Sequence, residues 1–370
     1  MIKILILPFL LIVPLFFFLA YQNHALVIKP DVFLSQNLST TTNQLEPNLS
    51  EITLSIDKVF AEDHSLADSL PADRKRVLIA TGDVLLARTV NYKNVTSRNF
   101  AWPFEKTADV LKNADITFIN LETPLIKNCP LVNEGFKFCG SDKNIEGLTF
   151  SGVDVVSLAN NHAGNYGFEA INYTASLLRN NDILVTGQNG AVYKKVRGLT
   201  FAFLGYNDIG YKQEGISWTD ENKIQTEIAE ARKNSDVVVV TFHWENEYQS
   251  QPNERQKYLG HLAVDNGADL VIGNHPHWIQ PVEIYKEKLI TYAHGNFIFD
   301  QEWSPKTKQG VGGRYTFYDN QLVDVEFLPV QIMNYGQPYF IEDFTQKQKI
   351  IDGMWNESKK LEDETKITQK

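Results

Sequence analysis

The stretch Leu270-Val-Ile-Gly-Asn-His-Pro-His-Trp278 joins an apolar run to two histidines separated by a proline. The run is rich in β-branched residues and does not alternate with polar ones, which predicts a strand buried on both faces of a parallel sheet. We expect Gly273 to let the backbone turn sharply where this strand ends. Ligands of open α/β sheets bind beyond the carboxyl ends of the strands, so His275 and His277 are placed as metal ligands. Taken alone, the two could equally be surface histidines of a loop.

The other predicted strands decide between these alternatives. Apolar runs at 76–83, 116–120, 153–159 and 237–242 also predict buried strands, and side chains that can bind a metal stand at or just after their ends. These side chains are Asp83, Glu122, Asn161, His162 and His243. Five strands that each bring a carboxylate, an amide or an imidazole to one edge predict a metal centre. Mixed carboxylate and imidazole ligands suit Mn, Fe or Zn better than calcium.

Each of these residues also has a plainer interpretation. Asp83 could cap a following helix, and Glu122 could belong to a surface salt bridge. His162 could be a core histidine bonded to a backbone carbonyl group. Arg88 is either a substrate contact or one partner of a structural ion pair. Residues of a supporting role are expected further along the chain, at Asn296 and Asp300.

Strands and helices alternate through the middle of the chain. The helices are expected at about 100–114, 167–180, 220–234 and 254–266, between the strands. This alternation predicts a layered α/β fold. The loops that carry glycine match neither the P-loop nor the dinucleotide-binding pattern.

The ends of the chain have a different character. Ile4 to Tyr21 contain no charged residue and follow Lys3, which favours an uncleaved signal anchor over a cleaved signal peptide in residues 1–25. Either one places the folded part outside the cytoplasm. Residues 26–73 are expected to be a flexible tether, residues 74–335 the folded domain, and residues 336–370 a charged, partly helical tail.

Charge and cysteine content limit the possible partners. The formal net charge is −10 and no long basic run is present, which argues against nucleic acid as a partner. The two cysteines, Cys129 and Cys139, do not have the spacing of a metal site. In an oxidising compartment they could form a disulfide, with two free thiols as the alternative.

In chain order, six motifs resemble those of the capsule-biosynthesis protein CapA family, also called the poly-γ-glutamate capsule family. The motifs are Thr-Gly-Asp83 with Arg88, Asn120-Leu-Glu122-Thr-Pro, Ala-Asn-Asn161-His162, His243-Trp244, Gly273-Asn-His275-Pro-His277 and Gly295-Asn-Phe-Ile-Phe-Asp-Gln301. The resemblance covers about residues 76–332. It implies a calcineurin-like metallophosphoesterase fold, which is an α/β/β/α layered sandwich.

The resemblance also implies roles for individual residues. The implied ligands of one or two divalent ions are Asp83, Glu122, Asn161, His243, His275 and His277. His162 would protonate the leaving group, and Arg88 would neutralise charge on the substrate. Leu85 stands where the first phosphoesterase motif has a second ligand, and Glu122 stands where that pattern has a bridging aspartate. One metal site would therefore be weak, or the centre would hold a single ion.

Two functions follow from the resemblance. The first is a metal-dependent hydrolase or transferase that acts on an anionic envelope polymer or its phosphate-linked precursor. It would be membrane-anchored and extracytoplasmic, beside other capsule-synthesis membrane proteins. The second is a non-catalytic, membrane-anchored scaffold or polymer-binding component of a capsule assembly or export complex, which Leu85 favours. A secreted nucleotidase is less favoured, because no aromatic pattern for clamping a base is present.

Overall fold

The computed structural model describes residues 53–368, with side chains described as far as residue 365. The predicted signal anchor and most of the predicted tether lie outside these residues. Within them, no helix combines the length and the apolar character needed to cross a membrane.

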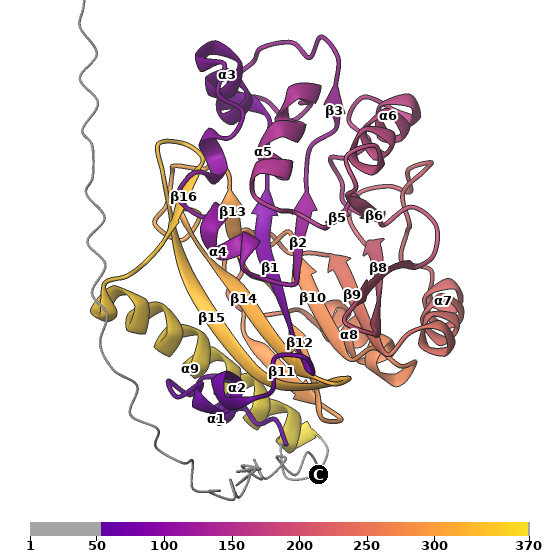
Figure 1. The fold of residues 1–370 in the computed structure, drawn as a ribbon, viewed down its shortest axis with the longest axis vertical. Coiled ribbons are helices and arrows are strands. Elements are labelled where there is room, and N and C mark those ends of the chain that lie inside the picture. The colour runs from indigo at the N-terminus through magenta and orange to yellow at the C-terminus, as the bar shows by residue number, and fades with distance from the viewer. Residues whose placement is uncertain (1–52, 369–370) are drawn as a thin grey trace, which may run out of the picture. The chain divides into compact units, whose positions relative to one another are not determined.

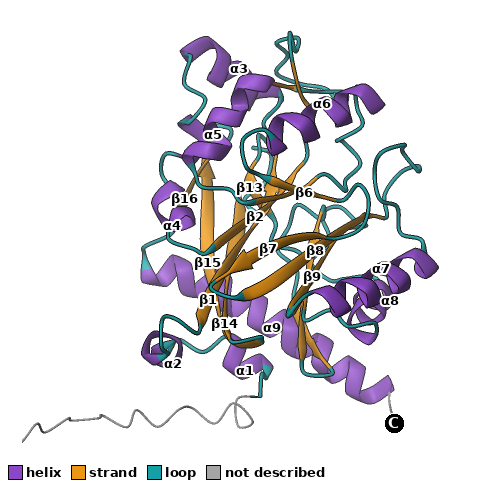
Figure 2. Ribbon diagram, turned by 45° about the vertical axis from the view of Figure 1, so that its right-hand side comes forward, coloured by secondary structure: helices purple, strands orange, loops and turns teal. Residues whose placement is uncertain are grey.

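Two β-sheets face each other and form the centre of the fold (Figures 1 and 2). The first sheet runs in the order β16 (Gln337–Phe340), β15 (Gln321–Met333), β14 (Gln309–Tyr318), β1 (Lys75–Val84), β2 (Ile116–Leu121), β5 (Val155–Ser157) and β6 (Leu184–Thr186), with β13 (Asn296–Ile298) also paired to β1. The second runs β11 (Val282–Tyr285), β12 (Lys288–Thr291), β10 (Leu270–Asn274), β9 (Val237–His243), β8 (Leu199–Asn207) and β7 (Val192–Val196). A short pair, β3 (Leu125–Ile126) and β4 (Gly140–Ser141), stands apart.

The strands are apolar on both faces because both faces are covered. In β9, Val237 and Val239 pack between the two sheets, whereas Val238 and Val240 pack against the helices outside. Successive side chains of a strand point to opposite faces, so a continuous apolar run is what a sheet between two layers requires. This confirms the prediction of buried strands.

Helices cover the outer face of each sheet. Over the first sheet lie α3 (Arg88–Ser97), α4 (Ala108–Lys112), α5 (Ile145–Phe150) and α6 (Phe168–Arg179), and over the second lie α7 (Glu221–Asn234) and α8 (Glu254–Asp265). A reciprocal capping box starts α8: Gln256 N–H donates to Asn253 Oδ1, and Asn253 N–H donates to Gln256 Oε1, both at 2.9 Å. The helix, sheet, sheet, helix order agrees with the predicted layered α/β/β/α fold.

Both ends of the described chain differ from the expectation. Residues 53–73 were expected in a tether, yet they form α1 (Ile56–Val59) and α2 (Ser65–Ser69), and Ile56 and Val59 are buried against the core between the sheets. The expected tail forms β16 and then α9 (Phe344–Thr368), with Met354 and Leu361 buried. The apolar residues of α9 recur at helical spacing and lie against the sheets. Helix α9 therefore belongs to the fold.

Hydrogen bonds also join α9 to β11 and to α1. The backbone N–H of Val282 in β11 donates to Ser358 Oγ at 2.9 Å, and the indole N–H of Trp355 donates to Asp57 Oδ1 at 3.1 Å. Figure 1 shows α9 running along the sheets with α1 and α2 beside it. The helices at the two ends of the described chain thus stabilise each other.

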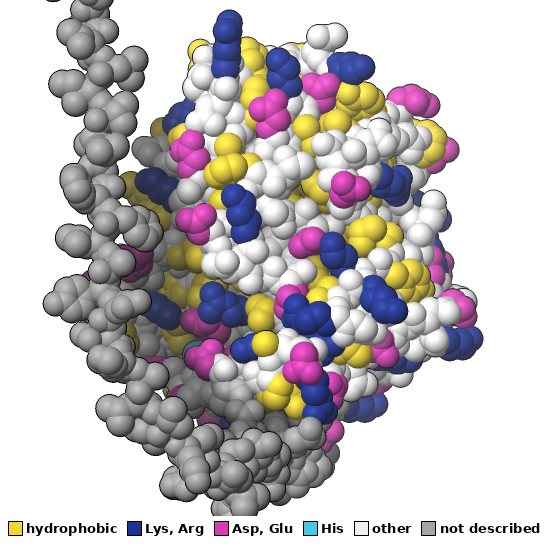
Figure 3. Space-filling model, viewed as in Figure 1, with side chains coloured by type: hydrophobic (Ala, Val, Ile, Leu, Met, Phe, Trp, Pro, Cys, Tyr) yellow, Lys and Arg dark blue, Asp and Glu magenta, His cyan; other side chains and the backbone are white. Residues whose placement is uncertain are grey.

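The middle of the chain holds two smaller differences. The helix expected at 100–114 is a 3-10 turn, η2 (Trp102–Phe104), followed by the short α4. Pro103 stands at the start of the turn, and the residues between the two pieces are not helical. On the face shown in Figure 3, acidic and basic side chains are intermingled.

Candidate metal centre

The carboxyl ends of four parallel strands meet at the candidate site. Strands β1 and β2 come from the first sheet, and β9 and β10 come from the second. Asp83 is the second-to-last residue of β1, and His243 is the last residue of β9. Glu122 directly follows β2, and His275 directly follows β10. The site therefore joins the two sheets, which no single strand-end motif could indicate.

The position of Asp83 depends on a change of partner in β1. Residues 75–80 pair with β14, whereas Asp83 and Val84 pair with β13. A Cβ atom on Gly82 would lie 2.1 Å from the carbonyl oxygen of Gly295, so only glycine permits this approach. The backbone N–H of Asp83 donates to the same carbonyl at 2.9 Å. The Thr-Gly-Asp sequence thus has a structural reason as well as a chemical one.

A first group of possible ligands consists of Asp83, Glu122 and His243. One ligand atom from each lies within 4.8 Å of the others, and all three side chains are buried. The amide nitrogen of Asn120 lies 2.9 Å from Asp83 Oδ1, 3.1 Å from Glu122 Oε1 and 3.2 Å from His243 Nδ1. An amide nitrogen has two hydrogens for these three neighbours, so Asn120 holds the group together without satisfying it.

The buried acids of this group favour binding of a cation. Burial, and next the charge of Asp83, raise the pKa of Glu122 well above its ordinary value. Burial opposes ionisation of Asp83 too, but a hydrogen bond from His277 and the charge of that ring outweigh it and lower the pKa of Asp83. Burial, and then the charges of His275 and His277, lower the pKa of His243. The centre therefore holds a neutral imidazole beside two acids that cannot both ionise easily.

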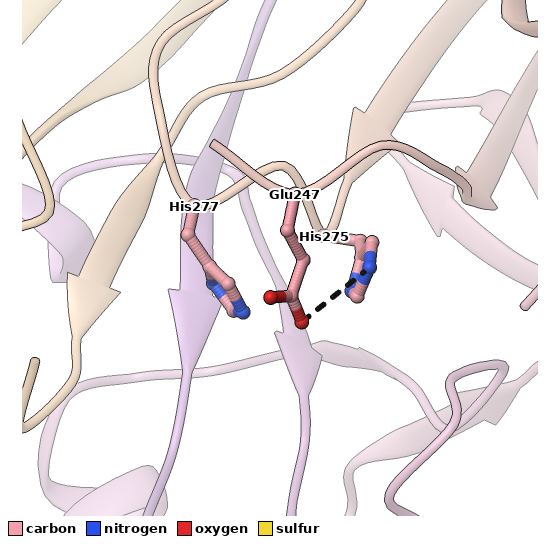
Figure 4. A group of neighbouring side chains, drawn as sticks. All are labelled: Glu247, His275 and His277. Atoms are coloured by element: carbon pink, nitrogen blue, oxygen red, sulfur yellow. Dashed lines mark ion pairs between the residues drawn. The ribbon is translucent and has the colours of Figure 1, made fainter. Parts of the chain in front are cut away.

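A second group consists of Glu247, His275 and His277, whose ligand atoms also lie within 4.8 Å of one another. Figure 4 shows the Glu247 carboxylate between the two imidazole rings, with its ion pair to His275 dashed. Glu247 Oε1 is 3.8 Å from His275 Nε2, and Glu245 Oε2 is 3.3 Å from the same nitrogen. The side chains of Glu247 and Glu245 remain 42% and 46% exposed, so the carboxylates reach the site from its open side.

Neither glutamate was among the predicted site residues. Both lie in the loop after β9, which has no periodicity to place it. Their spacing could have indicated them as site residues, since glutamates stand two and four residues after His243.

The backbone around the two histidines is unusual. His275 has φ 96° and His277 has φ 58°, in the left-handed region that side chains other than glycine rarely occupy. Such strain costs about 1–3 kcal/mol per residue and is typical of functional sites. His277 Nδ1 lies 2.9 Å from Asn296 Oδ1 and 3.3 Å from Asp83 Oδ2, so the ring is fixed from two sides. Asn296 has the supporting role predicted for it.

The two groups form one centre. His277 contacts Asp83, and the rings of His243 and His275 have centroids 4.8 Å apart. Asn161 Oδ1 lies 3.0 Å from His243 Nε2 on the other side. The structure thus brings together all six predicted metal ligands.

The two predicted catalytic residues lie beside these ligands. His162 packs on Phe138 with ring centroids 4.4 Å apart, and its Nδ1 is 3.4 Å from Asn165 Oδ1. Burial lowers the pKa of His162 to about 4, so the ring is neutral near pH 7 with only the charges of the protein around it. Arg88 forms an ion pair with Asp300 and lies over the Phe138 ring, 5.1 Å from its centroid. This ion pair is the structural alternative predicted for Arg88.

A disulfide-bonded loop supports both residues. Cys129 and Cys139 are bonded, which confirms the pairing considered from the sequence. Within this loop, the carbonyl oxygen of Gly135 accepts a hydrogen bond from Arg88 Nη1 at 3.3 Å, and Phe138 provides the ring beneath His162 and Arg88. Phe136 of the same loop is 87% exposed.

Gly273 has a different role from the one expected. It lies inside β10 rather than in a turn, and a Cβ atom there would be 2.0 Å from the carbonyl oxygen of Tyr292 and 2.6 Å from the Trp244 indole. The glycine is needed for close packing against Trp244, a fully buried side chain. Leu85 is also fully buried, in the core beneath the helices of the first sheet, and contributes nothing to the centre.

The residues present fit a divalent cation. Glu122 Oε2 and His275 Nδ1 are buried and have no hydrogen-bond partner among the described residues. Buried polar atoms are almost always paired, so two such atoms in one carboxylate and imidazole cluster favour a ligand that the protein itself does not supply. Imidazole nitrogen with carboxylate oxygen is a donor set suited to Mn, Fe or Zn.

Comparison with known proteins identifies the family. Residues 77–301, more than half of the chain, match the family described as bacterial capsule synthesis protein PGA_cap. The chain belongs to this family. It is 30% identical to the PGA biosynthesis protein CapA of Bacillus subtilis over 288 residues, which cover 73% of this chain and 75% of the relative. It is 28% identical to the capsule biosynthesis protein CapA of Bacillus anthracis over 311 residues, covering 78% and 75%.

Likeness to solved structures is weaker. A protein of Mycoplasma pneumoniae described as a novel phosphatase aligns with a TM-score of 0.45 and 15% identity, over 70% of this chain and 94% of its own. The assignment to the PGA_cap family therefore rests on the sequence matches.

Proposed function

We propose that this PGA_cap protein is a metal-dependent hydrolase or transferase of phosphoesterase type that acts in the synthesis of a capsule polymer such as poly-γ-glutamate. The observation that carries the proposal is the buried centre with unpaired atoms on Glu122 and His275. The names of the two Bacillus relatives, a capsule biosynthesis protein and a PGA biosynthesis protein, support the process.

The ligands divide between the two sheets. Asp83, Glu122 and Asn161 follow strands of the first sheet, and His243 and His275 belong to strand ends of the second. Together they would hold one ion or two, with His277 next to Asp83. Glu247 would supply a further ligand, while Leu85 offers none at the second ligand position of the first motif. A bound divalent ion would activate water and polarise an anionic oxygen of the substrate.

The neighbouring side chains would position the substrate and the proton. His162 is neutral unless a negative charge approaches, so an anionic substrate would raise its pKa and enable it to protonate a leaving group. Arg88 keeps its Nε buried and unpaired among the described residues, although Asp300 and Gly135 engage the rest of the guanidinium. Its positive charge, rather than a bond from the buried Nε, would therefore stabilise a substrate oxygen nearby.

The proposed location is the outer side of the membrane. The disulfide between Cys129 and Cys139 favours an oxidising compartment. A signal anchor in residues 1–25 would hold the protein beside other membrane proteins of capsule synthesis, with an anionic envelope polymer or its precursor as substrate.

One observation favours the second function, a non-catalytic scaffold. Leu85 fills the core instead of offering a ligand, so the centre departs from the two-metal pattern of active phosphoesterases. A scaffold would support capsule formation without turnover.

An experiment with paired variants separates the two functions. The full chain, loaded with Mn, Fe or Zn, would be assayed on bis(p-nitrophenyl) phosphate and on poly-γ-glutamate, beside His275→Ala and the control His261→Ala. His261 pairs with Glu283 outside the centre, so its variant keeps activity. The proposal predicts turnover that His275→Ala abolishes, together with loss of capsule in cells. Normal capsule in cells that carry only His275→Ala would support the scaffold instead.

A further inference from the structure

A groove adjoins the metal centre on the side of α9. It has a volume of about 480 Å³ and lies between α9 and the segment around Lys306. Its lining includes Trp278, Pro305, Lys306, Lys349, Gly353 and Glu357. The volume is within the range of sites that hold small ligands or short pieces of a chain.

Ring contacts link one wall of the groove to the centre. Trp278 directly follows His277 in the chain, so one wall of the groove begins at a metal ligand. The Tyr248 ring lies 5.9 Å from the His277 ring and 6.1 Å from the Trp278 ring, measured between centroids. Trp303, which is 64% exposed, lies 6.1 Å from Tyr248. These rings form a series of contacts from Trp278 in the groove wall to His277 in the centre.

The polar groups left unpaired in the groove favour an anion. Lys306 Nζ lies 4.1 Å from the centroid of the Trp278 ring, and Lys349 has no ion-pair partner among the described residues. The indole nitrogen of Trp278 is buried without a hydrogen-bond partner in the same part of the chain. The groove thus offers two ammonium groups and one N–H donor.

The groove also contains one acid, Glu357, which offsets part of this positive charge. Glu357 accepts hydrogen bonds from Lys360 Nζ at 2.7 Å and from the Gln251 amide. The hydrogen bond from Lys360, and then that from Gln251 and the charges of Lys360 and Lys306, lower the pKa of Glu357. Two ammonium groups and one carboxylate therefore line the groove, with a net positive charge.

Gly353 lines the groove. It lies inside α9, where glycine costs about 1 kcal/mol relative to alanine. A Cβ atom on Gly353 would meet nothing within 4 Å, so no packing contact among the described residues requires the glycine. Because Gly353 lines the groove, a larger side chain at this position would extend into it.

We infer that this groove binds a stretch of an anionic polyamide, of the γ-linked polyglutamate type, and leads it to the metal centre. Lys306 and Lys349 contact side-chain carboxylates, and the Trp278 indole donates to an oxygen of the polymer. The inference rests on the proposed function for the choice of polymer, whereas binding in the groove does not require catalysis.

The test measures binding of fluorescently labelled γ-glutamate oligomers to the full chain, purified in mild detergent and treated with a chelator. Gly353→Leu fills the groove at a position with space for it, and we expect it to weaken binding by about tenfold or more. Lys349→Gln is expected to weaken binding by about two- to fivefold and to reduce its dependence on salt. Gly353→Ala and Lys347→Gln are the controls, since Lys347 lies near Glu326 and does not line the groove.

The outcomes separate this inference from the proposed function. Weaker binding to Gly353→Leu, with metal content and thermal stability undiminished, supports the groove even if no hydrolysis is found. Equal binding by wild type, Gly353→Leu and Lys349→Gln overturns the groove and leaves the metal centre untouched. Equally tight binding of a neutral polyglutamine oligomer also overturns it, because the lysines would then have no role.

Discussion

Glu122→Gln separates the metal-binding role of this residue from its structural role. The side chain is fully buried, and burial keeps its carboxyl group from ionising easily in the absence of a cation. Glutamine has the same shape without the charge, so the free energy of unfolding of the metal-depleted protein is expected to change by less than about 1 kcal/mol. The response to a metal ion is expected to change much more.

The magnitude follows from linkage between binding and unfolding. An ion at a hundred times its dissociation constant stabilises the wild type by about 2.7 kcal/mol. For a folded part of this size, that corresponds to a rise in melting temperature of about 4 °C. If the substitution weakens binding about a hundredfold, the same ion concentration stabilises the variant by only about 0.4 kcal/mol.

The assay is urea or thermal unfolding of the full chain with and without Mn, Fe or Zn. Glu283→Gln is the control: it changes another buried carboxylate, which bonds Tyr292 and His261 outside the centre. That variant is expected to lose stability but to keep the full response to the ion. An equal response to the ion in wild type and Glu122→Gln would refute the assignment of Glu122 as a ligand.

Three further predictions concern the surroundings of the centre. Asn296→Ala removes the hydrogen-bond partner of His277 Nδ1 and is expected to lower metal affinity by about 10- to 100-fold. Competition with a chelator measures this affinity, and an unchanged affinity would contradict the prediction. Met354→Ala opens a cavity under α9 and is expected to cost about 2–5 kcal/mol in urea unfolding, whereas a dispensable tail would tolerate it. The hydrogen bond to Asp324 raises the pKa of His64, so its stabilisation is full below the unfolded pKa of about 6.5 and is lost as the pH rises through the folded value. The stability difference between wild type and His64→Gln, about 1 kcal/mol or less, should therefore shrink between pH 6 and pH 8, and a difference that grows contradicts the sign.

The strand ends were predictable because a strand buried on both faces is a continuous run of apolar residues. A run such as 237–242 must be apolar on both faces, and the polar residue that ends it then stands out. Asp83, His243 and His275 were found in this way. Helix α9 was harder to place, since its buried residues are separated by many charged ones that face solvent.

The rest depended on contacts that sequence spacing does not encode. Glu247 reaches the centre from a loop, where no periodicity indicates which way a side chain points. Asn120 was part of a motif, but its three contacts appear only when both sheets are assembled. Gly273 was assigned to a turn because the bulky neighbour that requires it, Trp244, lies far away in the sequence, directly after β9.

The most direct test of the central claim is the metal content of the purified full chain, measured by elemental mass spectrometry beside His277→Ala and His261→Ala. The account predicts about one to two equivalents of a transition metal in the wild type and in His261→Ala, and loss of metal in His277→Ala. A folded wild type that stays empty when Mn, Fe and Zn are offered, or a His277→Ala variant with undiminished metal, would contradict it.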